Sequence, residues 1–311
     1  LLTTVVSAIK PNIIHIMGDD VGYDNIGIFN SNKSTTPNLN ALLGRDGIFL
    51  SSYHTFKICG PSRASAMTGR YPFNLGFYGD GKAQHITNYT TTAELLSQHG
   101  YTTSAIGKWD VGYVVKETTA TFKGFDTFLG YYMACNDDLF YHTKAVCSKE
   151  TTSPTDMSRN VGTHISPEKN VNGTYSTRLF TTEAISVLKN HFVSSESPTR
   201  SNPIYMYIAP QNVHLACGTI SSKITQGIQA PCTTVNEFEY VKNDTYKGQS
   251  AVTRELDYLV GNITTTLKQL KQWNNTILIF TSDNGGPLDH TTNYPLRGGK
   301  HTFWDGGVRV L

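Results

Sequence analysis

The chain has 311 residues, of which 38% are hydrophobic and 16% are charged, and its formal net charge at pH 7 is +2. This hydrophobic content excludes a wholly disordered chain, and a charge so close to zero argues against general nucleic-acid binding. No apolar run in the sequence approaches the roughly 20 residues of a membrane-spanning helix. The length suits one large domain or two smaller ones.

Short apolar runs alternate with segments of helical periodicity along the chain. In chain order the patterns predict a strand at 12–17, helices at 36–43, 61–68 and 92–99, a strand at 102–106, a helix around 180–188, a strand at 203–209, a helix at 252–270 and a strand at 276–281. This alternation predicts an α/β fold with a largely parallel sheet and helices on both faces.

Two segments do not follow this alternation. Residues 135–173 are polar and show little periodicity, so we expect a loop-rich, surface-exposed insertion pinned by a disulfide. Residues 1–11 are interpreted as an N-terminal extension or the remnant of a signal peptide, with the two alternatives about equally favoured. The α/β domain is expected to occupy residues 12–311.

The sequons and cysteines favour the secretory pathway. The Asn-x-Ser/Thr sites are Asn32, Asn88, Asn172, Asn243, Asn262 and Asn274. Among the five cysteines, the simplest proposal for a secreted chain is a pair of local disulfides, Cys135–Cys147 and Cys217–Cys232. Cys59 is then the odd cysteine, which is a buried thiol, an intermolecular bridge or a chemically used residue.

Polar residues follow the ends of the predicted strands. They are Asp19 and Asp20 after the first strand, Lys108 and Asp110 after the second, His214 after the third, and Asp283 with Asn284 after the fourth. Ligands bind at the carboxyl ends of open parallel sheets, so we expect these side chains to share one rim. Each residue taken singly has an ordinary structural explanation, such as a turn or a helix cap. The carboxylate and amide oxygens together suit Ca²⁺ or Mg²⁺ and not Zn²⁺.

Cys59 lies in a distinctive segment, Cys59-Gly60-Pro61-Ser62-Arg63, that is followed by Thr68-Gly69-Arg70. Pro61 suits the first turn of a helix and Gly69 its end, which places Cys59 at a helix N-terminus. A thiolate nucleophile normally needs a nearby histidine base, and none is adjacent in the sequence. The spacing alone leaves the chemistry of Cys59 open.

This Cys-x-Pro-Ser-Arg and Thr-Gly-Arg pattern resembles the signature of the type I sulfatases. Further family blocks match in order at 18–22, 107–109, 213–214, 282–286 and 296–300, so that the resemblance runs from about Asn12 to Leu311. The stretch from Trp273 to Thr276, leading into Asp283-Asn284-Gly285-Gly286, looks most like the arylsulfatase B branch.

The resemblance implies an alkaline-phosphatase-like α/β sandwich, with the family's smaller C-terminal domain expected to be absent from this chain. It implies conversion of Cys59 to formylglycine by the formylglycine-generating enzyme, and one Ca²⁺ held by Asp19, Asp20, Cys59, Asp283 and Asn284. Arg63, Lys108, His214 and Lys300 would carry catalysis. The implied activity is sulfuric ester hydrolysis on sulfated glycans or aryl sulfates, in an extracellular or lysosomal protein.

One position departs from the family pattern. Asp110 stands in Lys108-Trp109-Asp110 where the family usually has histidine. This departure supports an alternative hypothesis, a catalytically impaired sulfatase-like protein that binds sulfated glycans or serves as an extracellular structural or assembly component. Phosphate-ester hydrolysis is a weaker alternative, because phosphatases of that superfamily usually use a Ser or Thr nucleophile and more metal ligands.

Overall fold

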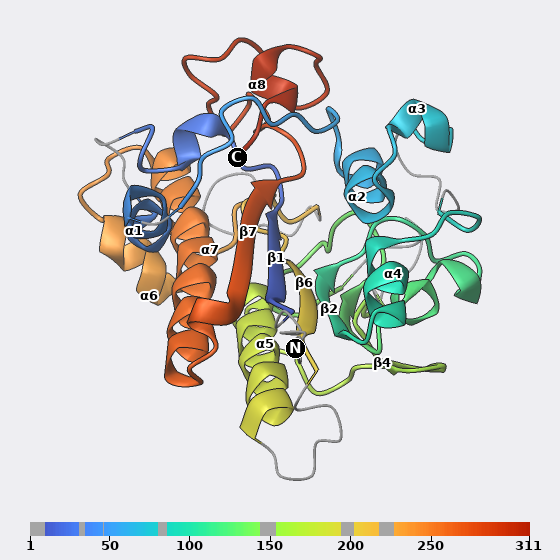
Figure 1. The fold of residues 1–311 in the computed structure, drawn as a ribbon. Coiled ribbons are helices and arrows are strands. Elements are labelled where there is room, and N and C mark those ends of the chain that lie inside the picture. The colour runs from blue at the N-terminus through green and yellow to red at the C-terminus, as the bar shows by residue number, and fades with distance from the viewer. Residues whose placement is uncertain are drawn as a thin grey trace, which may run out of the picture.

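A mixed sheet forms the centre of the molecule (Figure 1). The computed structural model describes residues 10–30, 35–45, 47–79, 86–143, 154–193, 202–217 and 227–311. Within these residues the sheet has seven strands in the order β5-β4-β3-β2-β6-β1-β7. The strands are β1 (Asn12–Gly18), β2 (Thr102–Lys108), β3 (Thr127–Tyr131), β4 (Ser158–Val161), β5 (His164–Pro167), β6 (Ile204–Ala209) and β7 (Thr276–Ser282). All pairings are parallel except those that add the hairpin β4–β5 to the edge of β3.

Helices cover both faces of this sheet. The α-helices are α1 (Pro37–Arg45), α2 (Cys59–Thr68), α3 (Pro72–Leu75), α4 (Thr92–Gln98), α5 (Ser176–Val193), α6 (Cys232–Val235), α7 (Asp244–Gln269) and α8 (Asp305–Val308). Helices α1, α5 and α7 pack on one face, where α7 presents a buried row from Val252 to Leu267. Helices α2 and α4 pack on the other face, over β2 and β6.

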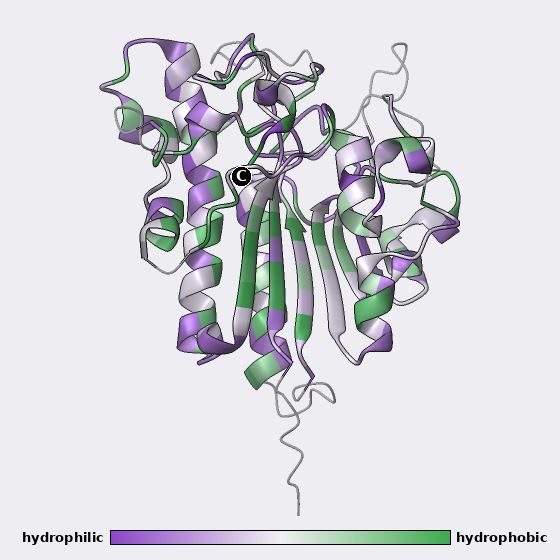
Figure 2. Cartoon of the chain, turned by 45° about the horizontal axis from the view of Figure 1, so that its top comes forward, coloured by the Kyte–Doolittle hydropathy of each residue, from purple (hydrophilic) through white to green (hydrophobic). Residues whose placement is uncertain are grey.

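The hydrophobic runs of the strands account for this layering. Strand β6 is buried along its whole length, and Figure 2 shows hydrophobic residues concentrated in the strands, between helices that also carry hydrophilic residues. Strands buried on both faces read as continuous apolar runs, which is the pattern found at 203–209. Within the described residues, no helix is both long and apolar enough to cross a membrane.

Strands β2 and β3 approach each other closely at a pair of glycines. A Cβ atom added to Gly130 would lie 1.9 Å from the carbonyl oxygen of Gly107, which itself has φ +101°. Only glycine fits at such a contact. The close approach holds β2 in the position from which it delivers Lys108 to the end of the sheet.

The predicted α/β fold with a largely parallel sheet is confirmed, and each predicted strand and helix is present, although α5 is longer than expected at both ends and α7 begins at Asp244, eight residues before its expected start. The pattern did not predict β3 or the hairpin β4–β5, whose strands have four or five residues and mixed exposure. The hairpin falls inside the region 135–173, of which residues 144–153 lie outside the described part.

The disulfide prediction is wrong. The structure pairs Cys135 with Cys217, with their Cα atoms 6.1 Å apart, so neither Cys135–Cys147 nor Cys217–Cys232 forms. The loops after β3 and β6 lie side by side here, and the Cys217 amide donates to the Asn136 carbonyl at 3.0 Å. Cys232 is a free, exposed thiol, and Cys147 lies outside the described residues. Proximity in sequence misled the prediction because the sheet brings distant loops together.

Most sequon asparagines are accessible. Asn88, Asn172, Asn243, Asn262 and Asn274 are all exposed, and Asn32 lies outside the described residues. Their exposure is compatible with glycosylation in the secretory pathway.

Candidate active site

Four neighbouring strands deliver polar side chains to one end of the sheet. The strands β2, β6, β1 and β7 lie side by side, and at their carboxyl ends stand Lys108, His214, Asp19 with Asp20, and Asp283 with Asn284. All of these residues are buried except His214, whose side chain is 16% exposed. The structure therefore brings together the residues that the sequence placed at one rim.

The carboxylates after β1 are each paired with a lysine, of which Lys108 is buried and Lys300 is partly buried. Lys108 Nζ lies 2.8 Å from Asp19 Oδ2, and Lys300 Nζ lies 2.8 Å from Asp20 Oδ1. Burial alone would raise the pKa of both carboxyls, but the facing lysines and His214 outweigh it and lower both values. The two acids are therefore held as carboxylates.

Cys59 is the first residue of helix α2, and its side chain meets these carboxylates. Its Sγ lies 3.5 Å from Asp19 Oδ1. The helix begins there because Ile58 is extended, and it ends where Gly69 takes φ +65°. Burial and the charge of Asp283 raise the pKa of the Cys59 thiol well above its usual range. An unmodified thiolate is therefore disfavoured, despite the helix N-terminus.

Arg63 links α2 to the end of β7. Its Nε and Nη2 donate to Asp283 Oδ2 at 3.1 and 2.7 Å, and its Nη1 donates to the Tyr207 hydroxyl at 3.3 Å. Neither charged side chain is exposed to solvent. A buried, hydrogen-bonded pair of this kind fixes orientation, and losing one partner leaves an uncompensated charge. Sequence reasoning missed Tyr207, because a tyrosine within an apolar strand carries no pattern of its own.

The donor set fits a hard divalent cation. The ligating atoms of Asp19, Asp20, Cys59 and His214 lie within 4.8 Å of one another. Asn284 Nδ2 donates to Asp20 Oδ1 at 2.7 Å, while its buried Oδ1 has no hydrogen-bond partner. Such an orphaned acceptor beside carboxylates is what an oxygen-preferring cation would satisfy.

The charges at the site also favour a cation. Four carboxylates face three permanent cations, and the groups are Asp19, Asp20, Asp110, Asp283, Arg63, Lys108 and Lys300. Asp283 is not among the four clustered residues, and its oxygens accept from Arg63 and from the Asp20 amide. The four carboxylates and three cations together carry one more negative than positive charge. A divalent cation would make the net charge positive and allow an anion to bind.

A cavity of about 310 Å³ opens onto this cluster, and its walls include Cys59, His214, Lys300 and Asp110. His214 Nδ1 lies 2.7 Å from the Leu215 carbonyl. A carbonyl only accepts, so Nδ1 carries a proton and Nε2 is the ring nitrogen left to face Asp20, 3.5 Å away. The cavity thus presents a thiol, an imidazole and an ammonium group to one ligand.

Asp110 occupies the wall of the same cavity in a constrained backbone conformation. Its φ is +54°, and its carboxylate lies 3.8 Å from Lys108 Nζ. Burial raises its pKa, while Lys108 acts in the opposite direction. Asp110 is therefore part of the site and not a surface residue turned away from it.

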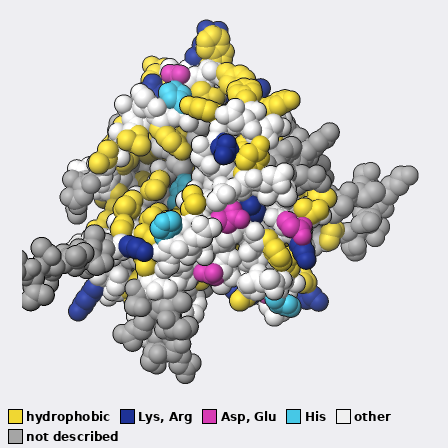
Figure 3. Space-filling view, turned by 45° about the vertical axis from the view of Figure 1, so that its right-hand side comes forward, with side chains coloured by type: hydrophobic (Ala, Val, Ile, Leu, Met, Phe, Trp, Pro, Cys, Tyr) yellow, Lys and Arg dark blue, Asp and Glu magenta, His cyan; other side chains and the backbone are white. Residues whose placement is uncertain are grey.

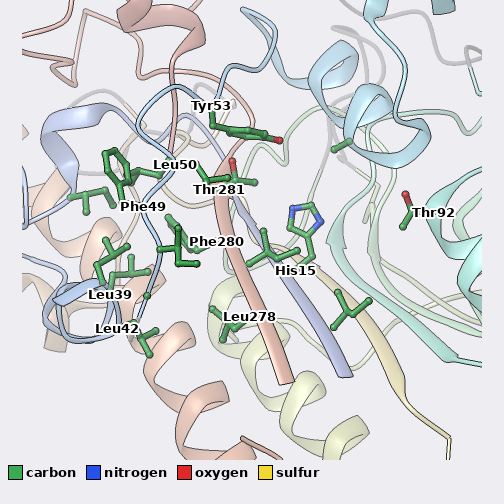
Figure 4. Close-up of a pocket in the computed structure, with 18 of the residues that line it drawn as sticks. His15, Leu39, Leu42, Phe49, Leu50, Tyr53, Thr92, Leu278, Phe280 and Thr281 are labelled. Atoms are coloured by element: carbon green, nitrogen blue, oxygen red, sulfur yellow. The ribbon is translucent and has the colours of Figure 1, made fainter. Parts of the chain in front are cut away.

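A second, larger hollow lies away from this chemistry. It has a volume of about 730 Å³ and is largely apolar, and Figure 4 shows it beside β7 with the His15 ring directed into it. Strands β1 and β7 form its floor because α2 and α4 cover only the β2–β6 half of that sheet face, which leaves Ile277 and Ile279 exposed. His15 Nε2 has no hydrogen-bond partner, and burial with nearby Arg63 lowers its pKa to about 4.

We compared the sequence and the fold of this chain with those of known proteins. A family model described as Sulfatase matches residues 11–310. Arylsulfatase J of Mus musculus is 31% identical over 308 residues, which are 97% of this chain and 47% of that protein. Arylsulfatase A of Homo sapiens is 27% identical over 317 residues, which are 96% of this chain and 57% of that protein.

A solved structure described as Ps i-CgsB in complex with k-i-k-neocarrahexaose superposes with a TM-score of 0.81 and 27% identity. The match covers 97% of this chain and 64% of that chain. This chain spans about half the length of the curated relatives it matches.

Proposed function

The chain belongs to the sulfatase family, and from this premise we propose that the protein hydrolyses sulfate esters of glycans in the cavity at Cys59. The observation that carries the proposal is the convergence of Cys59, two carboxylates and His214 within 4.8 Å, with two lysines paired to those carboxylates. Similarity to a protein whose structure holds a carrageenan hexasaccharide supports a glycan substrate.

We infer that Asp19, Asp20, Asp283, Asn284 and residue 59 hold a Ca²⁺ ion. The unpartnered Asn284 Oδ1 and the clustered carboxylate oxygens support this assignment. When bound, the ion would neutralise negative charge that builds up on the nucleophile and on the sulfate group.

Cys59 is proposed to act after conversion to formylglycine, whose hydrated aldehyde would supply an oxygen nucleophile toward sulfur. The raised pKa of the Cys59 thiol supports this proposal, since burial disfavours the thiolate that direct attack would need. The position at the start of α2 supports it as well, because the amides of a helix N-terminus favour negative charge.

The basic residues are proposed to bind the sulfate group and hold it in line. Burial would lower the pKa of Lys108 and of Lys300, but Asp19 and Cys59 raise both, and Asp20 also raises that of Lys300, so both ammonium groups keep their charge. Arg63 is fixed by Asp283 and contributes a further positive charge near Asp19. Preorganised charges of this kind stabilise the transition state without reorganising.

His214 is the proposed proton donor to the departing alcohol. His214 lines the cavity, its Nε2 lies 3.5 Å from Asp20 Oδ2, and its Nδ1 is held by the Leu215 carbonyl. Lys300 Nζ lies against the same carboxylate and would stabilise the leaving oxygen.

The alternative of glycan binding without turnover rests on Asp110, which lines the cavity where the family usually has histidine. A carboxylate there adds one negative charge beside the bound sulfate, and two like charges about 4 Å apart cost roughly 4 kcal/mol at an effective dielectric near 20. If Asp110 limits the reaction, Asp110→His raises the rate of sulfate release.

The decisive experiment joins peptide analysis to an activity assay. Mass spectrometry of the tryptic peptide Ile58–Arg63 from natively expressed protein is expected to show formylglycine at position 59. Sulfate release from an aryl sulfate and from sulfated oligosaccharides is expected in the wild type and absent from Cys59→Ala. An unmodified thiol together with no sulfate release at any pH would reject hydrolysis and favour the binding alternative.

The proposal extends to the cellular location of the protein. The exposed sequons and the Cys135–Cys217 disulfide support an extracellular or lysosomal protein. The similarity to the arylsulfatase B branch stays a prediction, as do the domain bounds and the insertion at 135–173.

A further inference from the structure

Exposed aromatic side chains gather beside the mouth of the Cys59 cavity. Phe73 is 66% exposed, Tyr78 is 61% exposed and Phe303 is 59% exposed. We refer to these three residues as the aromatic ledge. They come from the region around α3 and from the loop before α8, more than 200 residues apart. Figure 3 shows hydrophobic side chains exposed over the upper part of the molecule, where Figure 1 places α3 and α8.

The ledge is held rigid by one buried ring. Phe56 is 6% exposed, and its centroid lies 5.8 Å from that of Phe73 and 5.3 Å from that of Phe303, both edge-on. Tyr78 stacks on Phe73 at 6.2 Å. Ser62 of α2 fixes the Phe56 backbone, donating to its carbonyl at 3.1 Å and accepting from its amide at 3.0 Å. The ledge is therefore oriented by the same helix that carries Cys59.

The ledge is continuous with the cavity on two sides. Phe77 and Gly79, which flank Tyr78 in the sequence, line the cavity wall. His301 also lines it, two residues before Phe303, and its amide donates to the Lys57 carbonyl at 2.9 Å. A chain-like ligand that leaves the cavity on this side therefore meets the aromatic rings directly.

Positive charge accompanies the rings. The charge comes from Lys57, whose Nζ lies 4.7 Å from the centroid of the Phe303 ring. An aromatic face suits the apolar C–H face of a pyranose ring, and an adjacent ammonium group suits a sulfate substituent.

We propose that the aromatic ledge is a subsite for a further sugar residue of a sulfated oligosaccharide whose reacting sulfate lies in the cavity. The proposal rests on the function proposed for the cavity and names its substrate as a chain of sugars, not a single sulfated sugar. It predicts that the ledge contributes to the binding of sulfated oligosaccharides but not to the binding of single sulfated sugars.

The test compares binding of long and short sulfated ligands in the Cys59→Ala background, where no turnover occurs. The probes are sulfated hexasaccharides from chondroitin sulfate and from carrageenan, with the matching sulfated monosaccharides. In the added double variant Phe73→Ala/Phe303→Ala the Kd for a hexasaccharide is expected to rise about 10-fold, with the monosaccharide Kd unchanged. Tyr240→Ala removes an equally exposed ring from the segment before α7 and serves as the matched control.

The outcomes separate this proposal from the proposed function. Equal hexasaccharide affinity in the ledge variant and its parent overturns the ledge, and sulfate release by the wild type then still supports hydrolysis. Absence of sulfate release in the wild type, with hexasaccharide binding lost in the ledge variant, rejects hydrolysis and keeps the ledge. If light scattering shows that the ledge variant turns a dimer into a monomer, the rings belong to a self-contact and the subsite is overturned.

Discussion

Acidification is expected to destabilise the fold through His15. The imidazole lies in β1 with its Nε2 buried and unpartnered, edge-on to Tyr207 at 5.4 Å between ring centroids. Burial lowers its pKa from 6.5 to about 4, with nearby Arg63 acting in the same direction. The unfolded chain therefore binds a proton below pH 6.5, whereas the folded chain does so only near pH 4.

The sign and size of the effect follow from this difference. His15 favours the folded state fully above pH 6.5, and this contribution is lost as the pH falls through 6.5 towards 4. For a folded pKa of about 4, the free energy of unfolding falls by about 2 kcal/mol between pH 7 and pH 5, and by about 3 kcal/mol at pH 4.

Urea unfolding at pH 7, 6, 5 and 4 measures the effect in the wild type and in His15→Phe. Phenylalanine keeps an aromatic ring in β1 but cannot titrate, so the variant should lose less stability on acidification by the amounts above. His164→Phe, at an exposed position in β5, controls for the loss of a histidine. Parallel curves for the wild type and His15→Phe between pH 7 and pH 5 would refute the reasoning.

Three further predictions concern the framework of the site. Cys217→Ser opens a disulfide that spans 82 residues and should lower the free energy of unfolding by about 4 kcal/mol, and non-reducing peptide mapping of the wild type should recover that link. Arg63→Met leaves the buried Asp283 unpaired and should cost about 3–5 kcal/mol in urea unfolding, with the penalty reduced when Asp283→Asn is added; an additive double variant would contradict this pairing. Gly130→Ala would place a Cβ 1.9 Å from a carbonyl oxygen of the neighbouring strand and should cost about 3 kcal/mol or more, whereas Gly44→Ala, with nothing within 4 Å, should not destabilise; thermal melts compare the two.

The sequence predicted the parts of the fold that have strong periodicity. The apolar runs of β1 and β6 and the long buried row of α7 each span enough residues to identify an element. The hairpin β4–β5 could not be predicted in this way, because its strands have four residues each and little buried surface.

The candidate site was predictable because parallel strands end at one edge. Asp19 and Asp283 were expected to meet from their positions after two apolar runs, and the structure places them together around Arg63. The pairing of Cys135 with Cys217 was not predictable, since it depends on which loops the strand order makes adjacent. The aromatic ledge was missed for the same reason, whereas Tyr207 was missed because a tyrosine within an apolar strand carries no pattern of its own.

The pairing of the first strand with the last sets an order of events during synthesis. Strand β1 bonds along its length to β7, with Asn12 opposite Thr276 and Gly18 opposite Ser282. The pocket around Cys59 therefore closes only after more than 200 further residues have been made, and contacts so distant in sequence form slowly. In the folded chain Cys59 is only 7% exposed. If Cys59 is converted as proposed above, the converting enzyme would reach it most readily before the residues from Thr276 onward have been made.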